Sequence, residues 1–95
     1  MKPIWAMSGR FAGVIAGLQV YDREGRHVGY LRDKVMYRAA DGRAVGELYN
    51  EDTVGKRSGI AYPVGGASTC LATVGLSGYA DRGGAPIGGW NDPDF

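Results

Sequence analysis

Apolar and polar positions along the first sixty residues follow a repeated pattern rather than a continuous helical or strand period. Each copy has an aromatic residue, a short polar stretch, Gly-Arg, two further residues and a second glycine. Clear copies begin at Trp5, Tyr21 and Tyr37, a degenerate copy surrounds Gly55, and a fifth echo begins at Tyr79. Self-similarity at a fixed period indicates one supersecondary unit used several times.

The centre of each clear copy has the composition of a tight β-turn. Ser8-Gly9, Glu24-Gly25 and Asp41-Gly42 fit the two central positions of a hairpin turn, and Asp-Gly fits a type I′ turn best. The pattern therefore predicts three β-hairpins with two-residue turns.

This register also assigns a place to the second glycine of each copy. It pairs Asp22 with His27 and Val20 with Gly29, and the other copies place Gly13 opposite Ile4 and Gly46 opposite Tyr37. Glycine weakens a strand unless another group needs the space. We therefore expect a bulky cross-strand neighbour or another hairpin to approach each of these glycines.

Plausible return turns separate the copies, at Ala16-Gly17, Asp33-Lys34 and 50–52. The sequence thus predicts an all-β, up-and-down meander of repeated hairpins with two unpaired edges. Its 95 residues form a single domain, with hairpin repeats over 4–60 and Gly-rich C-terminal strands or an extension over 61–95. Helical spacing also fits 4–18 and 67–74, but the repeat favours a strand in the first segment, and Thr69, Thr73 and Val74 favour a strand over 68–76.

The two best copies resemble a known family. Tyr21 to Leu31 and Ala40 to Leu48, read as aromatic-Asp-x-x-Gly-(Arg/Lys)-x-x-(Gly/Ala) hairpins, are similar to the small bacterial proteins called the four-fold β-flower. The resemblance covers about 4–60. It implies hairpins arranged about a pseudo-four-fold axis, and it implies no catalytic residues, because the family is essentially uncharacterised.

Composition narrows the class of protein. The chain has 17 glycines, which argues against a helical bundle, and 11 basic against 10 acidic residues, which argues against a polybasic nucleic-acid binder. A single cysteine excludes an internal disulfide and makes the cytoplasm the default location. The apolar run from Phe11 to Leu18 is too short to span a bilayer. We expect neither nucleic acid nor a membrane as a partner.

Residues with catalytic or metal-binding chemistry are few. His27 is the only histidine, and one imidazole without a second histidine or cysteine does not make an ordinary zinc site. Cys70 lies in an apolar context, where we expect a small buried side chain. The sequence shows no base, nucleophile and orienting group together, so we predict no catalytic residue, cofactor or metal.

Basic residues follow the turn glycine in four copies: Arg10, Arg26, Arg43 and Lys56. If the hairpins are related by rotation, these cations form a ring that could hold a phosphate or carboxylate, since guanidinium groups suit both. The alternative, which we favour, is a set of solvated turn residues balanced by Glu24 and Asp41.

The stretch from Gly65 to Tyr79 carries no charged residue. Leu71, Val74, Leu76 and Tyr79 are the apolar residues that we expect to form an interface between copies of the chain, since an unprotected sheet edge pairs readily. The alternative is that this stretch folds back as a strand over its own flower of hairpins and completes the core within one chain. The sequence therefore predicts a small binding or assembly module that forms a homo-oligomer, with a small-anion or small-ligand binding protein as the first alternative and an enzyme as the second.

Overall fold

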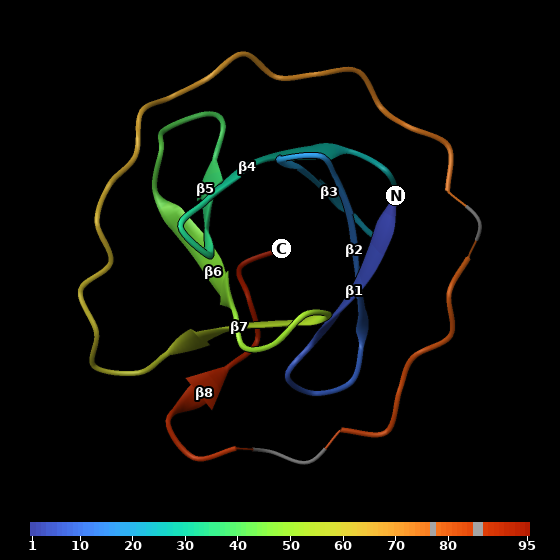
Figure 1. Ribbon diagram of the computed structural model, residues 1–95, viewed down its shortest axis with the longest axis vertical. Helices are drawn as coiled ribbons and strands as arrows, with labels where there is room; N and C mark the ends of the chain where they lie inside the picture. The colour runs from blue at the N-terminus through green and yellow to red at the C-terminus, as the bar shows by residue number, and fades with distance from the viewer. Residues whose placement is uncertain (77, 85–86) are drawn as a thin grey trace.

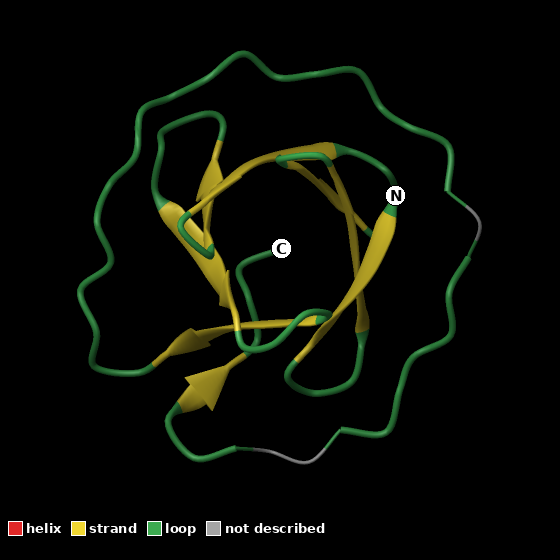
Figure 2. Ribbon diagram, in the orientation of Figure 1, coloured by secondary structure: helices red, strands yellow, loops and turns green. Residues whose placement is uncertain are grey.

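The computed structural model describes residues 1–76, 78–84 and 87–95. Eight strands follow one another along the chain: β1 (Lys2–Ala6), β2 (Phe11–Ala16), β3 (Gln19–Asp22), β4 (His27–Arg32), β5 (Val35–Arg38), β6 (Ala44–Leu48), β7 (Thr53–Arg57) and β8 (Trp90–Asn91). Each strand from β1 to β8 pairs antiparallel with the next. The predicted all-β meander is confirmed, and none of the described residues is helical (Figure 2).

The meander closes on itself (Figure 1). β1 pairs parallel with β7 through Trp5 with Thr53 and Ala6 with Val54, which makes a seven-stranded barrel. The Trp5 amide also donates to the Asp52 carbonyl at 2.7 Å. The expectation of two unpaired edges is therefore wrong, because the first and seventh strands satisfy each other.

The hairpin turns differ from the two-residue turns that the sequence suggests. Gly25 has a φ of +83°, its amide donates to the Asp22 carbonyl, and the Asp22 amide donates to the Arg26 carbonyl. This is a type I turn followed by a glycine in the left-handed region, a three-residue hairpin loop with a bulge. The bulge shifts the register by one residue, so Tyr21 faces His27, and the predicted pairing of Asp22 with His27 is wrong.

The third hairpin has a turn that is one residue longer, in which the Gly42 amide donates to the Arg38 carbonyl at 2.7 Å, and its register also shifts, between Met36 and Tyr37. Met36 lies opposite Gly46 and Tyr37 opposite Ala44, so the predicted pair Gly46 with Tyr37 is wrong. The pairs that lie beyond the bulges agree with the structure: Ile4 with Gly13, and Val20 with Gly29.

Two strand glycines allow the next hairpin to approach, as expected. A Cβ on Gly13 would lie 1.9 Å from the Tyr21 carbonyl oxygen, and a Cβ on Gly29 would lie 1.7 Å from the Tyr37 carbonyl oxygen. Any side chain at these positions would separate neighbouring strands of the barrel. The second glycine of the first two copies is therefore a packing requirement.

The described residues between β7 and β8, which are 58–76, 78–84 and 87–89, run around the outside of the barrel; we call them the belt (Figure 1). The belt crosses the three hairpin turns in reverse order, and at each turn a belt amide donates to the carbonyl of the turn glycine: Gly65 to Gly42 at 2.7 Å, Val74 to Gly25 at 2.9 Å and Arg82 to Gly9 at 2.6 Å. The strand expected over 68–76 is wrong, since the partners of the belt are isolated turn carbonyls rather than a sheet edge.

Apolar side chains fill both sides of the barrel wall. The interior cluster consists of Ile4, Ala6, Ala12, Ile15, Val20, Met36, Val45 and Val54, and Phe95 packs against it. The second cluster, Trp5, Phe11, Val14 and Tyr21, packs under Val74 and Leu76 of the belt. The belt thus completes a core that the short strands alone leave open, and the molecule is a disc of 34 × 33 × 17 Å. In the described ranges, no helix is long and apolar enough to cross a membrane.

We expect Gly25→Ala to destabilise the protein more than Gly59→Ala. Both glycines have a left-handed φ, +83° and +74°, but only a Cβ at Gly25 would meet the belt, 2.1 Å from the Val74 carbonyl oxygen. The backbone strain alone costs about 1–2 kcal/mol. The displaced belt adds at least about 1 kcal/mol at Gly25. Urea denaturation measures both, and equal losses would show that the belt does not lie against this turn.

Candidate functional site

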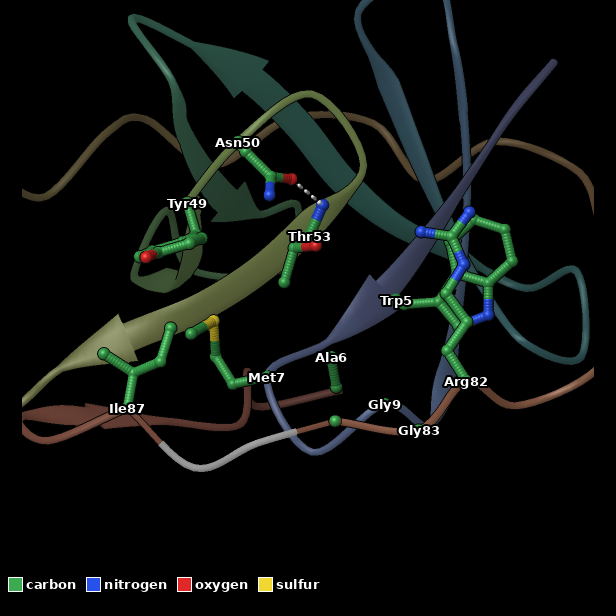
Figure 3. Close-up of a pocket in the computed structure, with 11 residues that line it drawn as sticks. Trp5, Ala6, Met7, Gly9, Tyr49, Asn50, Thr53, Arg82, Gly83 and Ile87 are labelled. Atoms are coloured by element: carbon green, nitrogen blue, oxygen red, sulfur yellow. Dashed lines mark hydrogen bonds between the residues drawn. The ribbon is translucent and has the colours of Figure 1, made fainter.

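A cleft of about 310 Å³ lies over the seam where β1 meets β7 (Figure 3). The barrel contributes one wall and the belt the other, so the cleft exists only in the closed fold. Its lining residues are Trp5, Ala6, Met7, Gly9, Tyr49, Asn50, Thr53, Arg82, Gly83, Gly84 and Ile87. We call it the seam cleft. Ligand sites in proteins are concave, mostly apolar and supplied with a few placed polar groups, and the seam cleft matches that description at the small end of the size range.

One end of the seam cleft is an arginine stacked on a tryptophan. The Arg82 guanidinium carbon lies 3.4 Å from the centroid of the Trp5 ring. Trp5 is itself fixed, since its indole N–H donates to the Ala80 carbonyl at 2.9 Å and its ring packs edge-on against Phe11 and Tyr79. A guanidinium over an aromatic face gains cation–π attraction and is held in one plane.

Asp52 holds the other side of this arginine. Arg82 Nη1 lies 2.8 Å from Asp52 Oδ2, and this hydrogen bond lowers the pKa of the Asp52 carboxyl below its ordinary value, against the opposing effect of burial. A guanidinium carries five N–H donors. At this end of the cleft, the negative charge of Asp52 thus balances the positive charge of Arg82. Arg82 still has N–H donors that this ion pair does not use.

The opposite end of the seam cleft is apolar. Met7, Ile87 and the Tyr49 ring surround it, and Tyr49 meets Trp90 edge-on at 5.1 Å between ring centroids. Asn50 adds one polar group between the two ends. Its Oδ1 accepts the amides of Asp52 and Thr53, so its NH₂ group is the end that is left for a ligand.

The four cations expected to form a ring are in two separate settings. Arg10 and Lys56 contact the C-terminal segment: Arg10 Nη2 donates to the Phe95 carbonyl at 3.0 Å, and Lys56 Nζ lies 2.8 Å from Asp94 Oδ2. Arg26 pairs with Glu24 and Arg43 with Asp41, inside their own turns. Arg10 Nε also lies 3.9 Å from Asp92 Oδ2. Of the four cations, Arg26 and Arg43 therefore have the partners, Glu24 and Asp41, that the alternative interpretation names.

Asp41 shows the strongest of these turn effects. Its carboxylate accepts from Arg38 and from the Arg43 amide, and these bonds, the Arg38 side chain first, lower the pKa of Asp41 to about 2. Through these hydrogen bonds, the carboxylate stabilises the turn that leads from β5 into β6.

The residues expected to form an interface between copies lie on the belt. Val74 and Leu76 are half-buried against the chain's own Trp5 cluster, and the Tyr79 ring lies 5.2 Å from that of Phe11. Leu71 is 44% exposed and Tyr79 40%. The alternative that the stretch folds back over its own barrel therefore describes Val74 and Leu76, while Leu71 and Tyr79 keep an outward surface.

His27 and Cys70 are separate from the seam cleft. His27 Nδ1 accepts the Leu71 amide at 3.1 Å, so Nε2 carries the proton and donates to Gln19 Oε1 at 2.8 Å. His27 thus attaches the belt to β4 through its hydrogen bond with the Leu71 amide. Cys70 is exposed, contrary to the buried position expected from its neighbours, because it lies in the belt, on the outside of the barrel. Among the described residues, no three His, Cys, Asp or Glu side chains are grouped for a metal.

Sequence reasoning missed the Arg82–Asp52 pair and a second carboxylate, Glu47. Glu47 is 8% exposed, and it accepts Arg57 Nη2 at 3.2 Å and the Tyr62 hydroxyl at 2.9 Å. Burial and the Glu47 hydrogen bond raise the pKa of Tyr62. Glu47 follows the second glycine of the third repeat in a strand, which is the only local signal that it faces a partner.

In comparisons with known proteins, no family model, curated protein or solved structure matches this chain.

The Arg82–Asp52 pair is testable by titration. Because the folded pKa of Asp52 lies below its unfolded value, the pair stabilises the fold above that unfolded value and loses this effect as pH falls through the folded pKa. We expect Arg82→Gln to return the Asp52 pKa toward its ordinary value in a carboxyl-carbon NMR titration. Asp41 is the internal control, and its pKa stays at about 2. An unchanged Asp52 titration in the variant would contradict the pair.

Proposed function

We propose that this protein is a small binding module without catalytic activity and that the seam cleft is its ligand site. The observation that carries the proposal is the composite wall: Trp5 from β1, Tyr49 from the end of β6 and Arg82 from the belt converge although they lie far apart in the chain. Such convergence of aromatic and polar side chains on one concavity favours recognition of a ligand.

The ionisable groups of the cleft support binding over catalysis. A general base works best when its pKa lies near the operating pH. The hydrogen bond from Arg82 instead lowers the pKa of Asp52, and so favours the charged carboxylate in the ion pair. Arg82 is in turn fixed between Asp52 and Trp5, so it is a positioned hydrogen-bond donor.

The charge balance of the cleft indicates the class of ligand. A further anion would enter beside an ion pair that is already neutral, and burying an unpaired charge is costly. A neutral ligand has no such cost. We therefore assign to the cleft a small neutral molecule with an apolar, flat body for Met7, Tyr49 and Ile87 and a carbonyl or amide edge for Arg82 and Asn50.

Self-assembly is the second candidate function, and one observation favours it. Apolar side chains remain exposed along the belt: Ile60 at 40%, Val64 at 70%, Leu71 at 44%, Tyr79 at 40% and Ile87 at 36%. The belt, on which these residues lie, runs around the outside of the barrel (Figure 1). A second copy that covers part of this rim would remove apolar surface from water.

The repeat pattern accounts for the belt that forms one wall of the seam cleft. β7 and β8 pair antiparallel, Lys56 with Asn91 and Arg57 with Trp90, as the two strands of a hairpin would. We take them as the fourth copy, whose turn is lengthened into the belt. This assignment gives the pseudo-four-fold arrangement of a β-flower, and it makes the belt side of the cleft a product of that lengthened turn.

A thermal-shift comparison of benzamide with benzoate tests the proposal. Benzamide should raise the melting temperature by about 5–10 °C at ten times its Kd, because binding stabilises the folded state by mass action. Benzoate, which has the same ring and a charged edge, should shift it much less. Ile87→Asp should abolish the benzamide shift, and Val64→Asp, a belt residue outside the cleft, should retain it.

The other outcomes distinguish the two functions. A melting temperature that rises with protein concentration and not with benzamide, with that rise lost in Leu71→Asp, would support assembly and reject the ligand site. A benzoate shift as large as that of benzamide would contradict the argument from charge balance.

A further inference from the structure

Two basic residues that make no ion pair in the described chain, Lys2 and Lys34, line the same cleft. Seven of the eleven basic residues make an ion pair in the described chain: Arg10, Arg26, Arg38, Arg43, Lys56, Arg57 and Arg82. Arg32 lies over the rings of Tyr30 and Tyr37. The other three, Lys2, Arg23 and Lys34, have neither kind of partner within the described ranges. Arg23 lies in the turn between β3 and β4, whereas Lys2 and Lys34 line one cleft.

This second cleft has a volume of about 380 Å³ and is lined by Lys2, Lys34, Leu48, Tyr49, Asn50 and Glu51. We call it the mouth cleft, because its residues come from the first strand, the β4–β5 turn and the β6–β7 turn. Leu48 also packs against the interior cluster, so the apolar wall of the cleft leads into the barrel core. The residues that line the cleft include two lysines and one carboxylate, Glu51, so the lining has a net positive charge.

An independent observation marks the same place. Asp33 and Lys34 have φ values of +51° and +68°, and they are the non-glycine residues with positive φ in the described chain. They form the two central positions of a type I′ turn between Arg32 and Val35. Asn-Gly would make this turn at lower cost, and strain of this kind is found at functional sites.

The turn is also held firmly. The Lys34 carbonyl accepts the Leu48 amide at 2.9 Å, which attaches the turn to the end of β6. The strained backbone therefore holds Lys34 on the rim of the mouth cleft, next to the apolar wall that Leu48 and Tyr49 provide.

We propose that the mouth cleft is a second binding site, which takes a phosphate monoester with a small apolar substituent. Lysine ammonium groups bind phosphate as point charges. Lys2 and Lys34 would hold the phosphate, and Leu48 and the Tyr49 ring would contact the substituent. The site is separate from the predicted ring of Arg10, Arg26, Arg43 and Lys56, whose charges are already paired.

An NMR titration at low ionic strength tests this site. Phenyl phosphate should shift the amide signals of Lys34 and Leu48 and bind at least about tenfold more tightly than inorganic phosphate, because only the ester has an apolar group for the wall. Equal affinities would reject the apolar wall as part of the site. No shift at either residue would reject the site.

The substitution Lys34→Gly tests separately the backbone strain at residue 34 and the positive charge of its side chain. Glycine adopts the positive φ freely, so the variant should melt at a higher temperature than the parent, while its affinity for phenyl phosphate should fall about tenfold or more. Arg26→Gln removes one charge at the other end of the barrel and should bind as the parent does. A stabilised Lys34→Gly that keeps full affinity would overturn the proposal, and so would equal losses in both variants.

Free metabolites and the head group of phosphatidic acid both offer a phosphate monoester. Co-sedimentation with phosphatidylcholine vesicles that contain phosphatidic acid distinguishes the two sources. We expect phenyl phosphate to bind and the vesicles to leave the protein in the supernatant, which identifies a soluble ligand. Co-sedimentation that Lys34→Gly abolishes would place the same chemistry on a lipid, and co-sedimentation that Lys34→Gly retains would contradict the site.

Discussion

The pairing of β1 with β7 converts a row of hairpins into a closed ring, and the other features of the molecule depend on it. The pairing is short, two residue pairs and the bond from the Trp5 amide to the Asp52 carbonyl. It satisfies both edges of the meander, encloses the interior cluster and places Trp5 of the first strand beside Thr53 of the seventh. The seam cleft lies over this junction, so the candidate site is a consequence of closure.

The closed barrel is too small to bury all of its aromatic residues inside. Trp5, Phe11 and Tyr21 point outward, and the belt covers them while its backbone bonds to the turn glycines. Glycine is needed at those turns because a side chain there would meet the belt backbone, as at Gly9, where a Cβ would lie 1.9 Å from the Arg82 carbonyl oxygen. A belt without regular structure is thereby fixed at intervals, and its residues can form one wall of a cleft.

The two clefts differ in the charged groups that line them. Tyr49 and Asn50 line both, on either side of the β6–β7 turn. The seam cleft holds a cation that is already paired, which suits a neutral ligand, and the mouth cleft holds two unpaired lysines, which suit an anion. The two clefts thus share the residues of one turn.

Local patterns in the sequence predicted much of the fold. The repeat with its turn and strand glycines was sufficient for an all-β meander and for pairs such as Val20 with Gly29. The bulges were not predictable from it, because Glu24-Gly25 fits a two-residue turn as well as the last positions of a three-residue loop. Closure and the path of the belt depend on contacts between distant residues, such as Arg82 with Asp52, that have no local signature. The candidate site was missed for that reason, since its walls meet only after closure.

The most direct test of this account is an NMR measurement of the seam in the protein in solution. We expect nuclear Overhauser effects between the backbone protons of Trp5 and Thr53, and slow hydrogen exchange of the Trp5 amide, because that amide donates to the Asp52 carbonyl at 2.7 Å. A Trp5 amide that exchanges as fast as those of exposed turns, with no Overhauser effect to Thr53, would contradict the closed barrel and the cleft that depends on it.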